Sequence, residues 1–126
     1  MPRFRLTPPK PLPISENHVE KQCTDLLKYR GYYPVRLHSG VFRTKDNRFI
    51  TVGERGLPDY AVLHRTFRGF FLETKKPGQG VSPEQAKKHW ELRKAYGLAV
   101  VTIARIEDLI PWLDEHEKTG PVDPAP

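Results

Sequence analysis

An acid and a base follow an apolar stretch in the segment FFLETKKPG, which spans residues 70–78. The apolar residues are typical of a buried strand, and successive side chains of a strand alternate between its two faces. Glu73 and Lys75 are therefore expected to share a face with Phe71. Placing both charges beside a sheet core costs desolvation free energy. Two interpretations follow: an ion pair where the strand reaches solvent, or half of an active site.

A second acid, Asp59 in GLPDY, is expected to lie against the first. Segments 57–65 and 70–76 predict two strands, and TFRG between them predicts the turn of a β-hairpin. With that turn centred near Thr66, Asp59 faces the region of Glu73, and directly opposed Cβ atoms lie ~5 Å apart. Two such carboxylates repel each other unless a cation lies between them. Oxygen ligands favour Mg²⁺ or Mn²⁺ over Zn²⁺, so the pattern indicates a divalent-cation site rather than a lone ion pair.

Sequence patterns around these residues predict the elements that position them. Ser15 and Gly31 bound one helix, and Ser82 and Gly97 bound another in which Gln85 completes a capping box. Further strands are expected at 32–38, 41–43, 48–52 and 98–104, the last one buried on both faces, and a short helix at 105–118. This order is typical of an α/β or α+β layered fold with a mixed sheet.

The composition indicates the number of domains, the class of binding partner and the state of the cysteine. The chain of 126 residues suits one domain at 15–117, between a basic, proline-rich extension at 1–14 and a proline-rich tail at 118–126, both expected to be disordered. A formal charge of +6 favours a polyanionic partner, nucleic acid first. The single cysteine, Cys23, excludes an internal disulfide and is expected to be a buried thiol.

No apolar run reaches the length of a membrane-spanning helix and no hydrophobic signal segment opens the chain, so we expect no membrane association. The expected compartment is the cytoplasm, which would be the host cytoplasm for a viral protein, or the nucleus for a eukaryotic one.

The motifs together resemble a known nuclease family. GLPDY and, thirteen residues after Tyr60, ETK match the P-D…(D/E)-x-K signature of the restriction-endonuclease-like superfamily. GLPD, FLETK and SPEQ, followed by a helix, a glycine and an apolar strand, are similar to the virus-type replication-repair nuclease (VRR-NUC) domain, and VRLHSG resembles an element of archaeal Holliday-junction resolvases. The resemblance covers residues 15–113. It implies an α/β restriction-endonuclease-like core, with a mixed sheet flanked by helices, and a metal-dependent endonuclease that acts on branched DNA as a homodimer.

The resemblance also implies roles for individual residues. Asp59 and Glu73 would bind Mg²⁺ or Mn²⁺ together with the backbone carbonyl of Thr74. Lys75 would orient or polarise the attacking water and offset negative charge on the scissile phosphate. Phosphodiester hydrolysis needs such groups, because a fixed cation stabilises the charge that builds on the phosphate and a metal lowers the pKa of bound water.

Two more residues each have two interpretations. Glu16 matches the family's acid on the first helix and would bind the metal directly or through water, yet the helix dipole stabilises any acid in a first turn. Glu20, one turn on, is the alternative acid. Gln85 matches a glutamine that would hold the water or Lys75, while its capping box alone would also explain it.

The resemblance implies that a basic segment between the first helix and GLPDY lies against the DNA backbone. Arginine and lysine on a glycine-jointed loop suit phosphate contacts, which position a protein without reading sequence. A solvated surface loop is the alternative. The candidate DNA-binding residues are Arg36, Ser39, Arg43, Lys45 and Arg48.

Other functions stay open at this point. The chain is expected to be an endodeoxyribonuclease, but a catalytically inactive DNA-binding module of the same fold would share its basic surface. A nuclease that prefers flaps or single strands, and a ribonuclease, are also compatible with the motifs. A sequence-specific restriction enzyme is disfavoured because the chain has little room for a base-reading insertion.

Overall fold

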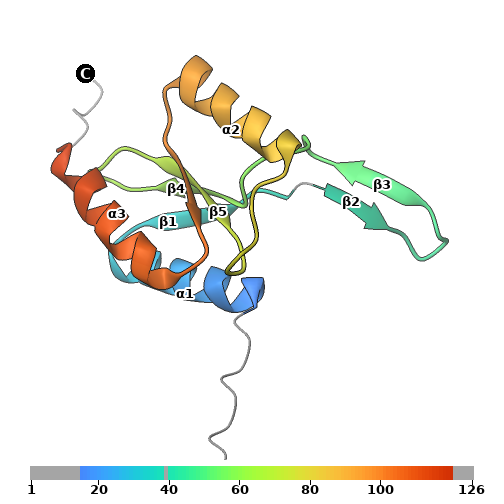
Figure 1. The fold of residues 1–126 in the computed structure, drawn as a ribbon, viewed down its shortest axis with the longest axis horizontal. Helices are drawn as coiled ribbons and strands as arrows, with labels where there is room; N and C mark the ends of the chain where they lie inside the picture. Colours follow the sequence, from blue (N-terminus) through green and yellow to red (C-terminus); the bar gives the residue numbers. More distant parts are fainter. Residues whose placement is uncertain (1–14, 39, 121–126) are drawn as a thin grey trace, which may run out of the picture.

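A mixed four-stranded sheet with helices on both faces forms the body of the molecule in the computed structural model, which describes residues 15–38 and 40–120 (Figure 1). The strand order is β1-β4-β5-β6. The elements are α1 (Glu16–Tyr29), β1 (Tyr33–Arg36), β2 (Gly40–Arg43), β3 (Phe49–Val52), β4 (Tyr60–Leu63), β5 (Phe70–Thr74), α2 (Pro83–Tyr96), β6 (Val100–Ile103) and α3 (Ile106–Lys118). The expected elements are all present, and the mixed α/β architecture is confirmed.

The sheet combines antiparallel and parallel pairing. β4 pairs antiparallel with both β1 and β5, whereas β6 runs parallel to β5. A parallel neighbour needs a crossover connection, and α2 supplies it between β5 and β6. Tyr60 lies opposite Leu72 and Val62 opposite Phe70, which is within one residue of the register expected for the β4–β5 hairpin.

One face of the sheet carries the hydrophobic core. Alternate residues of β4, β5 and β6 pack there against α1 and α3, which cover this face together. Cys23 is fully buried in the core, as expected, and burial raises its thiol pKa to about 12, so the thiol is protonated at neutral pH. The core side chains are Val19, Cys23, Leu27, Tyr32, Tyr60, Val62, Phe70, Leu72, Val101, Ile103, Leu109 and Leu113.

Among the elements that the structure describes, only α2 covers the opposite face of the sheet (Figure 1). Ser82 accepts a hydrogen bond from the backbone N–H of Gln85, and the Gln85 side chain accepts one from the backbone N–H of Ser82, so the expected capping box is confirmed. Only His89 among the α2 residues is buried. The expected burial of β6 on both faces is wrong, because Thr102 on β6 is exposed.

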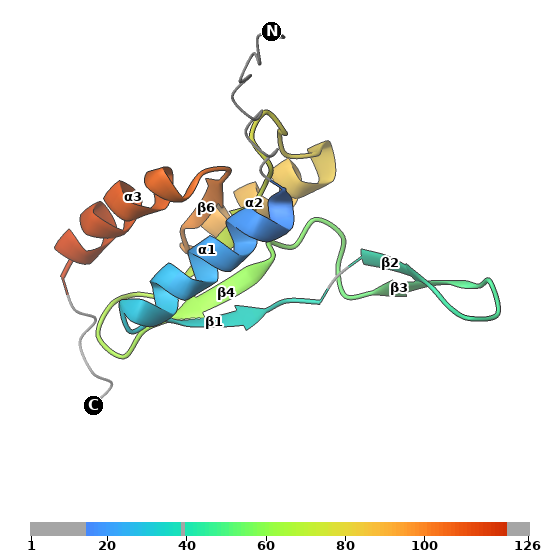
Figure 2. The same cartoon turned by 90° about the horizontal axis from the view of Figure 1, so that it is seen from below.

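Strands β2 and β3 form a separate antiparallel hairpin at residues 40–52, hereafter the hairpin arm. In both views of the ribbon the arm projects beyond the body (Figures 1 and 2). It connects β1 to the segment that leads into Asp59.

Several sequence-based expectations concern the ends of the chain. The extension at 1–14 and residues 121–126 of the tail lie outside the described residues, whereas Lys118 belongs to α3. Within residues 15–38 and 40–120, no helix is both long and apolar enough to cross a membrane.

Candidate active site

Asp59 is hydrogen-bonded to β5, the strand that carries Glu73. Asp59 directly precedes β4, and its backbone carbonyl accepts a hydrogen bond from the N–H of Leu37 at 2.8 Å, which continues the pairing with β1. Its Oδ2 accepts two further bonds, from the backbone N–H and the hydroxyl of Thr74, each at 2.9 Å. The hairpin register thus brings Asp59 to the end of β5, beside Glu73, as the sequence predicts.

Glu73 is a buried carboxylate with one engaged and one unengaged oxygen. Its side chain is 2% exposed. Oε1 accepts a hydrogen bond from Gln85 Nε2 at 3.1 Å and lies 3.5 Å from the ammonium nitrogen of Lys75. Oε2 lies 3.9 Å from His89 Nε2, and neither of these two buried atoms has a hydrogen-bond partner among the described residues. The expected pairing of Glu73 and Lys75 on one face is confirmed.

The electrostatics of the site disfavour a second negative charge. Burial, followed by the negative charges of Asp59 and Glu16, raises the pKa of Glu73 to about 7 against the opposing effect of Lys75. Burial likewise lowers the pKa of His89, with Arg93 and Lys75 adding to that effect. At neutral pH, Glu73 is therefore close to half protonated beside a neutral imidazole. A divalent cation near both acids would offset their repulsion, which is the second cause of this raised pKa after burial.

The donor set fits a small, hard cation that keeps part of its water shell. The described residues contain no group of three or more His, Cys, Asp or Glu side chains arranged to hold a metal ion. Mg²⁺ is often bound by only one or two carboxylates, with waters and substrate phosphates as its other ligands. Asp59, Glu73 and the carbonyl of Thr74 provide oxygen donors of that kind, and the unpartnered Oε2 of Glu73 is an acceptor in need of a partner.

Helix α2 contributes two residues to the site, one of which sequence analysis missed. Gln85 uses its side-chain oxygen for the capping box and its nitrogen for Glu73, so both interpretations of this residue hold together. His89 lies one turn further along the same helix face and packs against Glu73. Its spacing of four residues from Gln85 is the only sequence signal that pointed to it.

The acids of α1 behave differently from each other. Glu20 accepts hydrogen bonds from Tyr60 and Arg36, and the Arg36 guanidinium also lies 5.3 Å from the centre of the Tyr60 ring. Glu20 is thus committed to a network of its own. Glu16 is half-buried, and its charge acts on the pKa of Glu73, which makes it the better candidate of the two. Its role as a metal ligand stays a prediction.

The expected DNA-binding residues are spread over the root and tip of the hairpin arm. Arg43 Nε donates to Asn47 Oδ1 at 2.7 Å, and Arg48 Nε lies 3.4 Å from Asp46 Oδ2. Both arginines and Lys45 are exposed. Arg36 is paired with Glu20 at the edge of the body, and Ser39 lies outside the described residues. Their contacts with DNA stay predictions.

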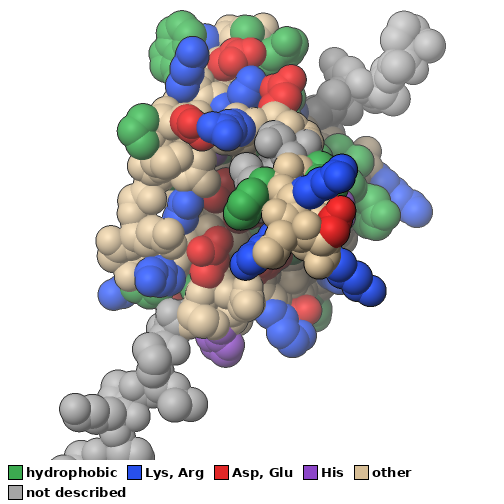
Figure 3. Space-filling view, turned by 90° about the vertical axis from the view of Figure 1, so that its right-hand side faces the viewer, with side chains coloured by type: hydrophobic (Ala, Val, Ile, Leu, Met, Phe, Trp, Pro, Cys, Tyr) green, Lys and Arg blue, Asp and Glu red, His purple; other side chains and the backbone are tan. Residues whose placement is uncertain are grey.

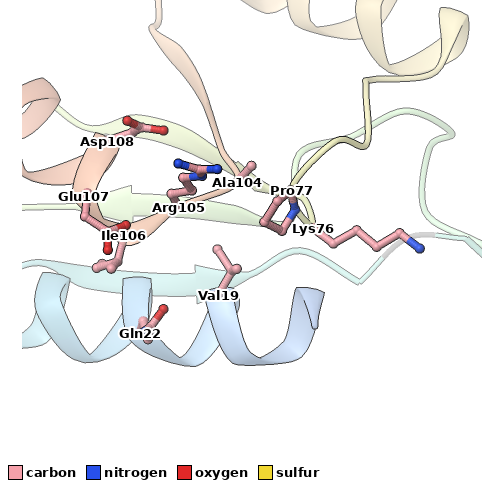
Figure 4. Close-up of a pocket in the computed structure, with 9 residues that line it drawn as sticks. All are labelled: Val19, Gln22, Lys76, Pro77, Ala104, Arg105, Ile106, Glu107 and Asp108. Carbon is pink, nitrogen blue, oxygen red and sulfur yellow. The ribbon is translucent and has the colours of Figure 1, made fainter. Parts of the chain in front are cut away.

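A cavity of about 790 Å³ lies near the acids but does not contain them (Figure 4). It is bounded by α1, the loop after β5 and the start of α3. Arg105 projects into its middle, while Lys76 points out of it (Figure 4). The lining residues are Val19, Gln22, Lys76, Pro77, Ala104, Arg105, Ile106, Glu107 and Asp108. Glu73 and Asp59 are not among them, so this cavity is separate from the candidate site.

A search of protein-family models finds no match to the chain, and a search of curated proteins finds none either.

Proposed function

We propose that this chain is a Mg²⁺- or Mn²⁺-dependent endodeoxyribonuclease with a VRR-NUC-like, restriction-endonuclease-like fold, acting on branched DNA such as four-way junctions. The observation that carries the proposal is the meeting of Asp59, Glu73 and Lys75 at the end of β5, where one buried Glu73 oxygen has no partner among the described residues. Two acids and a fixed ammonium group suit the hydrolysis of a phosphodiester.

Each residue has a role in this proposal. Asp59, Glu73 and the Thr74 carbonyl would hold the cation, which would supply hydroxide near neutral pH and neutralise phosphate charge. Thr74 fixes the orientation of Asp59 through two hydrogen bonds, and Gln85 does so for Glu73. Lys75 provides a buried positive charge that offsets charge building on the phosphate oxygens.

Cleavage of a defined set of DNA substrates tests the proposal. Linear, flapped, splayed and four-way DNAs are incubated with purified protein and Mg²⁺ or Mn²⁺, with EDTA as the control. We expect nicking of branched DNA by the wild type, and loss of that activity in Asp59→Ala and Glu73→Ala variants. Tyr96→Ala, an exposed change on α2, is the matched control and should cleave normally. Activity that persists in both acidic variants would overturn the assignment.

A non-catalytic DNA-binding module is the alternative function. One observation favours it: Gln85 and Lys75 already contact Oε1 of Glu73, which partly neutralises the acid without a metal. Calorimetric titration with Mn²⁺ separates the two functions. Heat of binding that disappears in Asp59→Ala supports the nuclease, whereas an empty site with retained DNA binding supports the module.

A homodimer is part of the proposal, because a four-way junction with two-fold symmetry requires two symmetric cuts. Light scattering on the purified protein, alone and with junction DNA, measures the number of copies. A single copy on the junction would contradict the paired cuts by a dimer. The proposal that the protein nicks DNA would not be affected by that result.

A further inference from the structure

The hairpin arm holds apolar side chains in solvent among basic ones. Phe49 is 74% exposed and Ile50 is 49% exposed. Arg43 pairs with Phe49 in the register of the arm, so these two side chains share one face, and Ile50 occupies the other. Residues 40–52 contain three basic residues and one acid, Asp46. An exposed aromatic ring beside basic groups fits a nucleic acid, because bases stack on aromatic rings and phosphates attract cations.

Hydrogen bonds within the turn fix the tip of the arm. The backbone N–H of Thr44 donates to the carbonyl of Arg48 at 2.8 Å, and the N–H of Asn47 donates to the carbonyl of Thr44 at 3.1 Å. Asn47 adopts a φ of 66°, a left-handed conformation that asparagine tolerates well. An isolated two-stranded hairpin is only marginally stable in water. The arm therefore has a defined tip but gains little from burial, as expected for an element completed by a partner.

The root of the arm is fastened to the helix that serves the acidic site. Lys88 on α2 contacts Glu54 at 2.8 Å, and Arg55 contacts Glu84 at 3.5 Å. The same helix carries Gln85, which contacts Glu73. Viewed towards the tip of the arm, Lys and Arg side chains lie beside hydrophobic ones, with acidic side chains among them (Figure 3). The root of the arm and the acidic site thus both contact α2.

We propose that the hairpin arm is a wedge that enters branched DNA, where Phe49 stacks on an unpaired base. This inference rests on the proposed function, since it takes branched DNA as the substrate. Arg43, Lys45 and Arg48 contact the flanking phosphates. A wedge favours branched DNA because bases at a branch point are already partly unstacked, whereas bases in an intact duplex must first be separated.

Binding and fluorescence measurements without cleavage test the wedge. Four-way and linear DNAs carrying 2-aminopurine at or beside the branch point are titrated with full-length protein in EDTA, so that no hydrolysis occurs. For Phe49→Ala we expect affinity for the junction to fall about 10-fold, because a base gains that order of binding from stacking on an aromatic ring. The affinity of this variant for the linear duplex should stay within about 2-fold of the wild-type value. The 2-aminopurine fluorescence of the junction bound to this variant should differ from that of the junction bound to the wild type.

Matched variants separate stacking from folding. Phe49→Trp keeps an aromatic ring and should retain junction affinity and signal. Tyr96→Ala removes another exposed aromatic side chain, 65% exposed, and should bind both DNAs like the wild type. The thermal midpoint of Phe49→Ala should equal that of the wild type, because Phe49 lies outside the hydrophobic core.

The outcomes distinguish the two proposals. Unchanged junction affinity and fluorescence in Phe49→Ala would overturn the wedge even in a protein that cleaves junctions. Loss of junction affinity in that variant, in a protein that cleaves nothing, would support the wedge while the nuclease function fails. Equal losses on linear and branched DNA would also overturn the wedge, because they indicate general backbone binding.

Discussion

Among single residues, Glu73 is the one whose charge should lower the stability of the fold, because its buried Oε2 has no hydrogen-bond partner among the described residues. A carboxylate that is buried beside another acid costs free energy when it ionises. Lys75 and Gln85 relieve part of this cost at Oε1, but His89 offers Oε2 no hydrogen bond. Natural proteins retain such costly groups mostly at functional sites, because stability alone would favour replacing them.

This cost predicts a specific dependence of stability on pH. The pKa of Glu73 is raised from 4.5 to about 7, so the folded protein binds more protons than the unfolded chain between those values. Its stabilising contribution is present below pH 4.5 and is lost as pH rises through 7. Glu73→Gln cannot titrate, so its free energy of unfolding relative to wild type should rise between pH 5 and pH 8, by on the order of 3 kcal/mol.

Urea unfolding in EDTA at several pH values measures the difference. Glu115→Gln, an exposed acid on α3, is the control and should run parallel to the wild type. Parallel profiles for Glu73→Gln as well would show that Glu73 ionises in the folded protein as it does in the unfolded chain.

At the element scale, the close approach between the root of the hairpin arm and α2 decides how the site is assembled. Gly56 adopts a φ of 81°, and a Cβ atom there would lie 2.5 Å from the carbonyl oxygen of Glu84. Only glycine permits this backbone to pass so close to the first turn of the helix. That turn contains Gln85, so a displacement of the backbone at Gly56 would also displace Gln85 and its hydrogen bond to Glu73.

Three glycine-to-alanine variants separate the effects. Gly56→Ala combines a left-handed φ with a backbone clash and should destabilise most, by more than about 1 kcal/mol. Gly78→Ala has a φ of 85° with open space around it, so only backbone strain should appear. Gly80→Ala has neither and should be close to neutral. Denaturant unfolding ranks the three, and equal midpoints for Gly56→Ala and Gly80→Ala would contradict the close packing.

Local rules account for the parts of this site that the sequence predicted. The pairing of Glu73 with Lys75 follows from alternation along one strand, and the position of Asp59 follows from a short hairpin. His89 was missed because its contact depends on how α2 lies over the sheet. Trp90 is exposed for the same reason: α2 buries only His89, so helical spacing of apolar residues does not mark a core-facing side there. Such placements are non-local and no sequence period encodes them.

At the scale of the whole molecule, the position of the positive charge matters more than its total. The chain has a formal charge of +6, but several cations of the body are neutralised by neighbouring acids, as Arg30 is by Glu117 at 2.6 Å and Arg36 is by Glu20. The hairpin arm, which projects beyond the body (Figures 1 and 2), carries exposed basic groups at its tip, and among the described residues Arg48 is the one of them paired with an acid, Asp46. A polyanion would therefore meet the arm first.

This asymmetry predicts which cations set the salt dependence of DNA binding. Each phosphate contact contributes about 0.9 to the slope of log affinity against log salt, because a counterion is released. The double variant Lys45→Ala/Arg48→Ala should lower the slope by about 2. Lys28→Ala/Lys118→Ala makes the same change in net charge in the last turns of α1 and α3, and should leave the slope unchanged. Fluorescence anisotropy with linear duplex at several salt concentrations measures both, and equal slopes for the two double variants would show that net charge, not the arm, attracts DNA.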